Sequence, residues 1–196
     1  MSSILAVCTG NICRSPIAEG LLRRSLTSRF GAEAPSISSA GMWGVEGSSA
    51  TPEAVAAAAE RGADIGNHVA RGVSAMPQID DDLVLCMARE HRDALVATDE
   101  RLRDRVFTLK EFVRLVESLP PVVDGDGPES LPGRVAEAAA ARADGFSGNP
   151  HDEDVVDPLG LPMQSYRAVA WELDEWIGRL VEGLYGPVAV GAASEG

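Results

Sequence analysis

Residues 8–16 read Cys8-Thr9-Gly10-Asn11-Ile12-Cys13-Arg14-Ser15-Pro16, and this stretch decides the fold. It follows an apolar run, residues 4–8, that has the composition of a short buried strand. Ser15 and Pro16 are the residue types of an N-cap and of a first helical position, which predicts a helix that continues to about Phe30. A strand, a tight loop and a helix N-terminus are therefore expected in direct succession.

A loop of this kind can bind an anion. Successive backbone N–H groups can point inward, and the following helix adds the positive end of its dipole. Arg14 adds a planar fork of donors that can hold two phosphate oxygens at once. Cys8 faces these groups and is expected to be a thiolate near neutral pH, and so a nucleophile toward a bound phosphate. The alternative is that Cys8 is one more buried small residue at a strand end.

Two further features of the loop fit this chemistry. Gly10 and Asn11 suit a loop that needs unusual backbone dihedrals. The Ser15 hydroxyl can donate to the Cys8 sulfur, which would make sulfur a better leaving group in a second step.

Predicted strands and helices alternate along the rest of the chain. Strands are expected at 36–40, 83–87 and 106–109, and helices at 51–61, 90–97, 110–119 and 165–184. This alternation predicts a single three-layer α/β domain with a short, about four-stranded parallel sheet flanked by helices. Ligands of such sheets bind outside the carboxyl ends of the strands, where Cys8 lies.

Residues 119–150 differ in composition from the rest of the chain, with Pro and Gly around the alanine-rich segment 134–143. They are predicted to form an inserted arm with one helix. Because the arm enters directly before Asp157, we expect it near the mouth of the pocket, as a lid or a partner surface. The folded domain is predicted to span 1–185, and residues 186–196 to form a flexible tail.

Composition excludes several classes of protein. Thirty acidic against 17 basic residues give a net charge of −13, which disfavours binding to nucleic acid or anionic lipid. No apolar run reaches the ~18 residues that span a bilayer, and residues 1–7 lack the basic start of a signal peptide. Three cysteines without a CxxC pair argue against a disulfide scaffold or a zinc site, and favour a cytoplasmic protein with reduced thiols. Lys110 is the only lysine.

The loop resembles that of the low-molecular-weight protein tyrosine phosphatases. The resemblance extends through Ala18-Glu19, Ser39-Ala40-Gly41, His68-x-Ala70-Arg71, Leu85-Cys86-Met87 and Asp157-Pro158, and covers most of the chain except the arm and the tail. It implies hydrolysis of phosphotyrosine in proteins, with Cys8 as nucleophile, Arg14 as phosphate ligand and Asp157 as general acid and then base. Phosphate contacts are expected from Thr9, Gly10, Asn11, Ile12, Cys13 and Ser15. The resemblance implies no metal or other cofactor.

The resemblance also suggests roles for residues outside the loop. His68 matches a histidine that hydrogen-bonds toward the loop asparagine and serine, and Trp43 lies where the family places a wall of the substrate pocket. Cys13 is a candidate reversible disulfide partner of Cys8, because such a bond would protect a reactive thiolate from irreversible oxidation. The partner implied is a phosphotyrosine protein, such as a bacterial tyrosine kinase of polysaccharide export. Family members that act on phosphoarginine tend to carry threonine where this chain has Ile12, which favours tyrosine.

Several alternatives remain open from the sequence. Asp-Pro is a common turn dipeptide, and residues 152–154 are acidic as well. His68, Trp43 and Cys13 also fit ordinary structural roles, Cys86 fits a core position, and His91 and His151 suggest no function. Leu159-Gly160 replaces an aromatic pair that often follows Asp-Pro in the family.

Two rival functions are an arsenate reductase on the same fold and a catalytically silent phosphotyrosine-binding module. The reductase needs a further close pair of thiols, whereas after the loop this chain has only Cys86. The silent module is disfavoured because every residue that the reaction requires is present. The oligomeric state is left open by the sequence.

Overall fold

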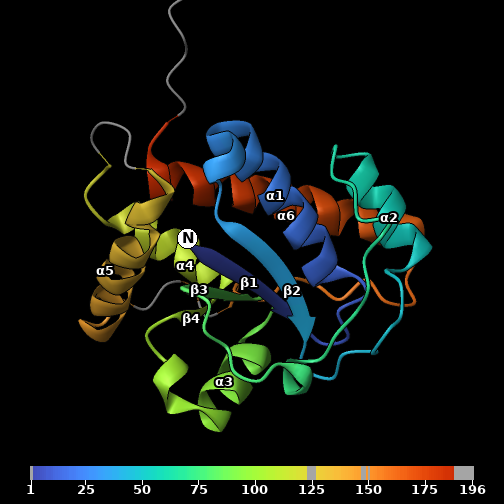
Figure 1. Cartoon of the computed structure of the whole chain (residues 1–196), viewed down its shortest axis with the longest axis horizontal. Helices are drawn as coiled ribbons and strands as arrows, with labels where there is room; N and C mark the ends of the chain where they lie inside the picture. The colour runs from blue at the N-terminus through green and yellow to red at the C-terminus, as the bar shows by residue number, and fades with distance from the viewer. Residues whose placement is uncertain (1, 123–126, 147–148, 150, 188–196) are drawn as a thin grey trace, which may run out of the picture.

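Four parallel strands form one sheet in the order β2-β1-β3-β4 in the computed structural model, which describes residues 2–122, 127–146, 149 and 151–187. The strands are β1 (Ser3–Cys8), β2 (Ser36–Gly41), β3 (Leu83–Cys86) and β4 (Val106–Thr108). β1 is a central strand that pairs with β2 on one side and β3 on the other (Figure 1). The predicted fold class is confirmed, and Cys8 ends a strand that is fixed on both sides.

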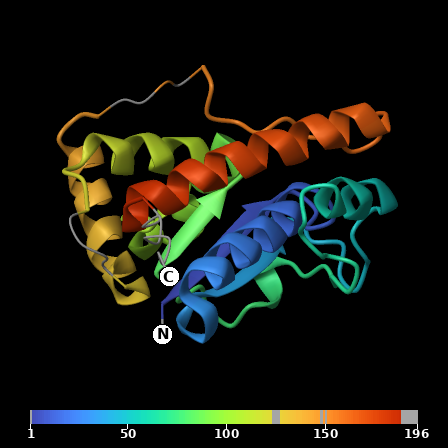
Figure 2. The ribbon, with the colours of Figure 1, turned by 90° about the horizontal axis from the view of Figure 1, so that it is seen from above.

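Helices cover both faces of the sheet. One face packs against α1 (Arg14–Phe30), α4 (Leu109–Ser118) and α6 (Met163–Tyr185), and α2 (Pro52–Ala59) joins the same core. Figure 2 shows α6 running along α1. The other face packs against α3 (Arg89–Thr98) and the segment 73–79. Successive strand residues alternate between the two cores, as a parallel sheet with two covered faces requires.

Local capping explains where several helices begin. Thr51 accepts from the Ala54 N–H and Pro52 opens α2, as predicted. Thr108 and Glu111 form a capping box, so β4 ends and α4 begins one residue away from the predicted boundary. The prediction that Ser15 caps α1 is wrong. That helix already begins at Arg14, with Cys13 at the N-cap and no side-chain capping bond.

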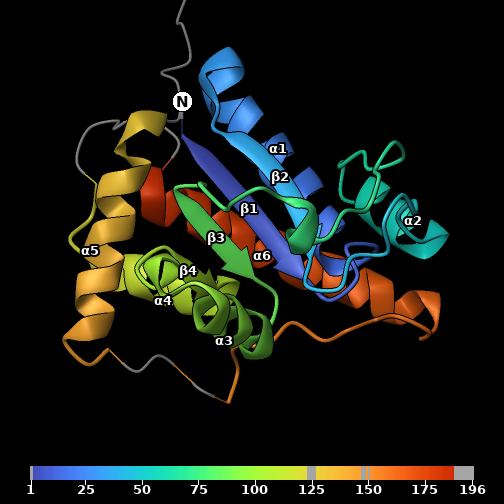
Figure 3. The same ribbon diagram turned by 60° about the horizontal axis from the view of Figure 1, so that its bottom comes forward.

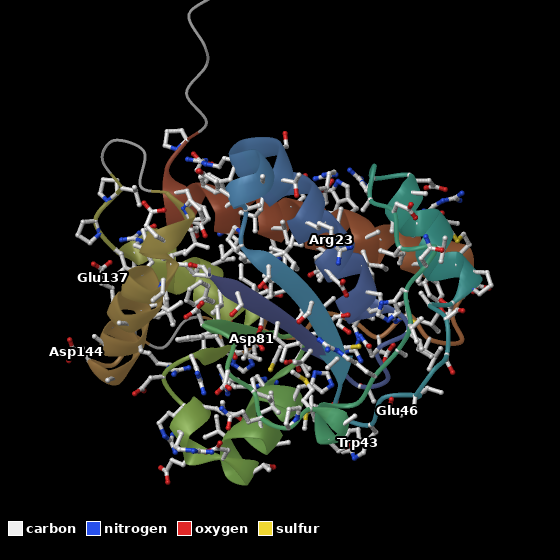
Figure 4. All side chains as sticks on the ribbon, in the orientation of Figure 1. Arg23, Trp43, Glu46, Asp81, Glu137 and Asp144 are labelled. Atoms are coloured by element: carbon white, nitrogen blue, oxygen red, sulfur yellow. The ribbon has the colours of Figure 1, made fainter. Side chains whose placement is uncertain are left out.

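The helix of the inserted arm is α5 (Leu131–Ala143), and it lies against α4. Its apolar side chains are buried in the main core: Leu131, Val135, Ala138 and Ala139. Figure 4 places Glu137 and Asp144 on the opposite side of the molecule from Trp43, and Figure 3 shows α5 on the opposite side of the sheet from α2. The expected position of this helix near the pocket mouth is therefore wrong, because its apolar face packs onto α4.

Parts of two predictions fall outside the described residues. They are positions 123–126, 147–148 and 150 of the arm, and 188–196 of the tail. Among the described helices, none is long and apolar enough to cross a membrane.

Candidate active site

The backbone of residues 8–13 turns its carbonyl oxygens outward, where neighbouring segments hold them. Four backbone N–H groups donate to these carbonyls: Met42 to Cys8 at 2.8 Å, Trp43 to Thr9 at 2.9 Å, Val45 to Gly10 at 3.1 Å and Thr51 to Ile12 at 2.9 Å. Since a peptide N–H points away from its C=O, the loop amides face inward. The amides of residues 9–13 have no acceptor in the described part of the chain. The loop is thus built as an anion-binding nest.

Asn11 gives the loop its shape. Its φ of +58° makes it the one described non-glycine residue in the left-handed region, so the unusual dihedral falls on Asn11 rather than Gly10. Its side-chain amide donates to Ser15 Oγ at 3.0 Å and Ser39 Oγ at 2.8 Å, while its Oδ1 accepts from the Arg71 N–H at 2.9 Å. These bonds offset the cost of the strained backbone.

Gly41 allows the end of β2 to approach the loop closely. A Cβ at this position would lie 2.8 Å from the Thr9 carbonyl oxygen and 2.9 Å from the Asn11 nitrogen. Both are backbone atoms, so a larger residue would displace the loop itself.

Cys8 and Ser15 are in direct contact within the nest. Cys8 is 2 % exposed, and its Sγ lies 3.0 Å from Ser15 Oγ. Ser15 Oγ also lies 3.3 Å from the Ala40 carbonyl oxygen. The single hydroxyl hydrogen can donate to the sulfur whenever the sulfur is anionic. This use of the hydroxyl explains why Ser15 does not cap α1.

Arg14 joins the loop to the predicted acid. The residue is 4 % exposed, and its Nη2 donates to Thr9 Oγ1 at 2.9 Å and to Asp157 Oδ2 at 2.5 Å. Its Nη1 donates to the Val155 carbonyl at 3.1 Å. Its Nε is buried without an acceptor among the described residues, so this donor remains for a ligand.

Asp157 is the acid that contacts this arginine. Its Oδ1 accepts from the Leu159 N–H at 3.1 Å, and its side chain is 43 % exposed. The three acids just upstream are engaged elsewhere: Asp152 by Lys110 and Arg114, Glu153 by Arg92, and Asp154 by Arg89. These ion pairs distinguish Asp157 from the three upstream acids, which the sequence left as alternative candidates for the same role.

His68 and Trp43 touch the loop from outside. His68 Nε2 lies 2.8 Å from the Asn11 carbonyl oxygen, to which it donates, and its Nδ1 lies 3.8 Å from Glu19 Oε2. Glu19 also accepts from Ser39 Oγ at 2.6 Å. Trp43 binds the loop through its backbone, and its side chain is 67 % exposed (Figure 4).

The other two thiols differ from Cys8 in their surroundings. Cys13 Sγ lies 3.6 Å from Thr51 Oγ1 and 3.8 Å from the Tyr166 hydroxyl, and burial raises its pKa. Cys86 lies inside β3, where complete burial raises its pKa strongly. Cys86 is therefore a core residue, as expected.

Comparison with known proteins settles the family. A family model described as low molecular weight phosphotyrosine protein phosphatase matches residues 3–122. The chain belongs to this family. It is 41% identical to the protein-arginine-phosphatase of Bacillus subtilis over 92% of this chain and 95% of that protein.

Solved structures of the phosphatase family agree. A low molecular weight protein tyrosine phosphatase from T. tengcongensis is 32% identical, with a TM-score of 0.66 over 94% of this chain and all of that one. A mutant of the arginine phosphatase YwlE with a phosphorylated active-site serine is 29% identical, with a TM-score of 0.65 over 93% and 95% of the two chains. The sequence-based identification is confirmed, and the chain is a phosphatase of this family.

His91 also contacts the loop, although no pattern in the sequence pointed to it. It is fully buried on α3, and its Nε2 lies 3.0 Å from Thr9 Oγ1, the oxygen that Arg14 also contacts. Its Nδ1 is buried without a partner in the described chain. Burial and the nearby Arg14 charge lower the pKa of His91. No local pattern signals this contact, which joins residues 82 positions apart.

The neutral state of His91 predicts a pH effect on stability. As pH falls below the ordinary pKa of 6.5, the unfolded chain takes up a proton that the folded chain excludes, so the free energy of unfolding decreases. The variant His91→Asn should show a weaker decrease. Urea unfolding of both proteins between about pH 7 and 5.5 measures this difference. Equal pH slopes for the two proteins would contradict the prediction.

Proposed function

We propose that this phosphatase hydrolyses phosphotyrosine in proteins through a phosphocysteine intermediate. The observation that carries the proposal is the convergence of Cys8, the inward amides and the Arg14–Asp157 pair at the carboxyl end of β1. Residues 1–185 form the phosphatase domain in this proposal, with 119–150 as an insertion.

In the first step, Cys8 Sγ attacks phosphorus while Arg14 and the loop amides hold the phosphoryl oxygens. An S–P bond forms, the P–O bond to tyrosine breaks, and Asp157 gives its proton to the leaving oxygen. Phosphate oxygens at Arg14 take the place of the Asp157 carboxylate, which frees that carboxyl to carry the proton. Preorganised donors of this kind are each worth ~3 kcal/mol in the transition state.

In the second step, Asp157 removes a proton from water, and the oxygen attacks phosphorus. The S–P bond breaks and the thiolate returns, stabilised by the Ser15 hydroxyl at 3.0 Å. Phosphate then leaves. Asp157 gives a proton in the first step and takes one from water in the second, so the acid is restored at the end of each cycle.

The side chains around the nest support tyrosine over arginine as the substrate. Ile12 and Val45 lie beside Gly10, and Trp43, Val156 and Leu159 are exposed apolar residues on the adjoining segments. Apolar walls suit a phenyl ring, whereas a phosphorylated guanidinium needs hydrogen-bond acceptors. The arginine phosphatase relatives make phosphoarginine the second candidate.

Direct competition between the two substrates tests the assignment. Peptides of one sequence carrying phosphotyrosine or phosphoarginine should differ in kcat/KM by at least about tenfold in favour of phosphotyrosine. The variant Ile12→Thr, which adds a hydroxyl acceptor, should move the ratio toward phosphoarginine. A wild-type preference for phosphoarginine would reassign the substrate without changing the roles of Cys8, Arg14 and Asp157.

We also propose that the natural partner is a phosphotyrosine protein, such as a bacterial tyrosine kinase. The net charge of −13 makes a neutral or basic substrate surface the better match. Trp43 and Cys13 keep their proposed roles as a pocket wall and as the disulfide partner of Cys8.

A further inference from the structure

The only lysine of the chain is buried beside the segment that carries Asp157. Lys110 is 3 % exposed, in the first turn of α4. Its Nζ lies 2.8 Å from Asp152 Oδ1, 3.1 Å from the Asp154 carbonyl oxygen and 2.6 Å from Glu172 Oε1. An ammonium group has three donors, so these three acceptors satisfy it. Burial alone would lower the pKa of Lys110, but the two carboxylates outweigh it and raise the pKa.

Two of the three acceptors belong to the segment 152–157, named here the acid loop. Arg114, one turn further along α4, also binds Asp152, through the carboxylate at 2.8 Å and the carbonyl at 2.9 Å. Past this anchor, the Val155 N–H donates to the Met87 carbonyl at 2.8 Å. The Val155 carbonyl then accepts a hydrogen bond from Arg14 Nη1. The acid loop is thus fixed at its start by α4 and at its centre by β3 and the arginine.

We propose that Lys110 positions Asp157 by holding the start of the acid loop against α4. This inference rests on the proposed role of Asp157 as the proton donor. Lys110 is a positioning residue, since it touches neither the nest nor Asp157. A single atom, Lys110 Nζ, donates to all three acceptors, two on the acid loop and one on α6. The compact charge of an ammonium group suits acceptors that meet at one atom, whereas a guanidinium spreads its donors over a planar fork.

The competing interpretation is a purely structural one. Lys110 also binds Glu172 of α6, and its Nζ lies 5.8 Å from the centre of the Trp176 ring, so it joins α4 to α6 as well. The two interpretations differ in which partner matters for catalysis. Asp152→Asn removes an acid-loop partner of Nζ, whereas Glu172→Gln removes the α6 partner and leaves the acid loop attached.

The decisive measurement is kcat/KM on two aryl phosphates with different leaving groups, because both form the same phosphocysteine and kcat/KM reports the step that releases the leaving group. Proton donation matters more for phenyl phosphate, whose leaving oxygen is strongly basic, than for p-nitrophenyl phosphate. Lys110→Met and Asp152→Asn should lower kcat/KM on phenyl phosphate by about tenfold, and kcat/KM on p-nitrophenyl phosphate by less than about threefold. Glu172→Gln should leave the ratio of the two rates unchanged. In an Asp157→Asn background, Lys110→Met should not alter the ratio further.

A second readout does not depend on turnover. Hydrogen exchange of the Val155 amide should be faster in Lys110→Met and Asp152→Asn than in wild type, and unchanged in Glu172→Gln. If Lys110→Met does not fold, Asp152→Asn against Glu172→Gln decides the question alone.

The outcomes separate the two levels of the proposal. If Asp157→Asn leaves the ratio of rates unchanged, Asp157 is not the proton donor and the proposal for Lys110 falls with it. If Asp157→Asn changes the ratio but Asp152→Asn does not, or Glu172→Gln changes it as much, only the positioning role is overturned.

Discussion

Replacing Cys8 with serine should reduce phosphate release on the order of 10⁴-fold or more, because the reaction loses its nucleophile. A serine hydroxyl stays protonated at neutral pH and needs a base to accept its proton. The side-chain partner of Cys8 in the described chain is another hydroxyl, Ser15 Oγ at 3.0 Å, which cannot act as that base. Steady-state hydrolysis of p-nitrophenyl phosphate measures the loss.

The serine variant should keep its affinity for oxyanions. The loop amides and Arg14 are unchanged, so phosphate or vanadate should still raise the unfolding temperature. Hydrolysis by the variant at a rate near wild type would refute the nucleophile assignment. A wild-type protein that binds phosphotyrosine peptides but releases no phosphate would instead be a silent binding module.

Replacing Arg14 with lysine should lower kcat/KM by about 10²- to 10³-fold, although the charge is kept. The guanidinium contacts Thr9, Val155 and Asp157 at the same time, with Nε left for a ligand. An ammonium group offers no fork for two phosphoryl oxygens and cannot make these contacts from one position. Kinetics with p-nitrophenyl phosphate and binding of phosphate should both show the loss.

Arg23→Lys is the matched control on the same helix. Arg23 pairs with Glu19 at the surface, and its side chain is 51 % exposed. The substitution keeps the charge and should change kcat/KM by less than about twofold, since exposed ion pairs contribute little. An effect of Arg14→Lys as small as that of the control would contradict the assigned role of Arg14.

The nucleophile loop and the fold were predictable because their determinants are local. Apolar runs mark the strands, and Thr51 followed by Pro52 marks the start of α2. Ser15 misled the prediction of the start of α1, because a serine before a proline usually caps a helix but here the hydroxyl faces Cys8. The capping rule failed at Ser15, whose side chain belongs to the proposed active site.

Contacts between distant segments could not be predicted. His91 meets Thr9 across 82 positions, and Lys110 meets Asp152 across 42, and neither pair has a local pattern. The position of α5 was also missed, since closeness in sequence to Asp157 suggested closeness in space. Its buried apolar face, with Leu131 and Val135, packs against α4 instead.

The separation of Arg14 from Asp157 by 143 positions has a consequence for protein synthesis. The chain leaves the ribosome N-terminus first, so the loop that carries Cys8 emerges long before Asp157. The segments that hold the loop, residues 42–51 and 68–71, emerge earlier than α6, which packs against α1. Turnover by the proposed mechanism therefore needs synthesis past residue 157, and a chain interrupted before that point would carry the loop without the acid.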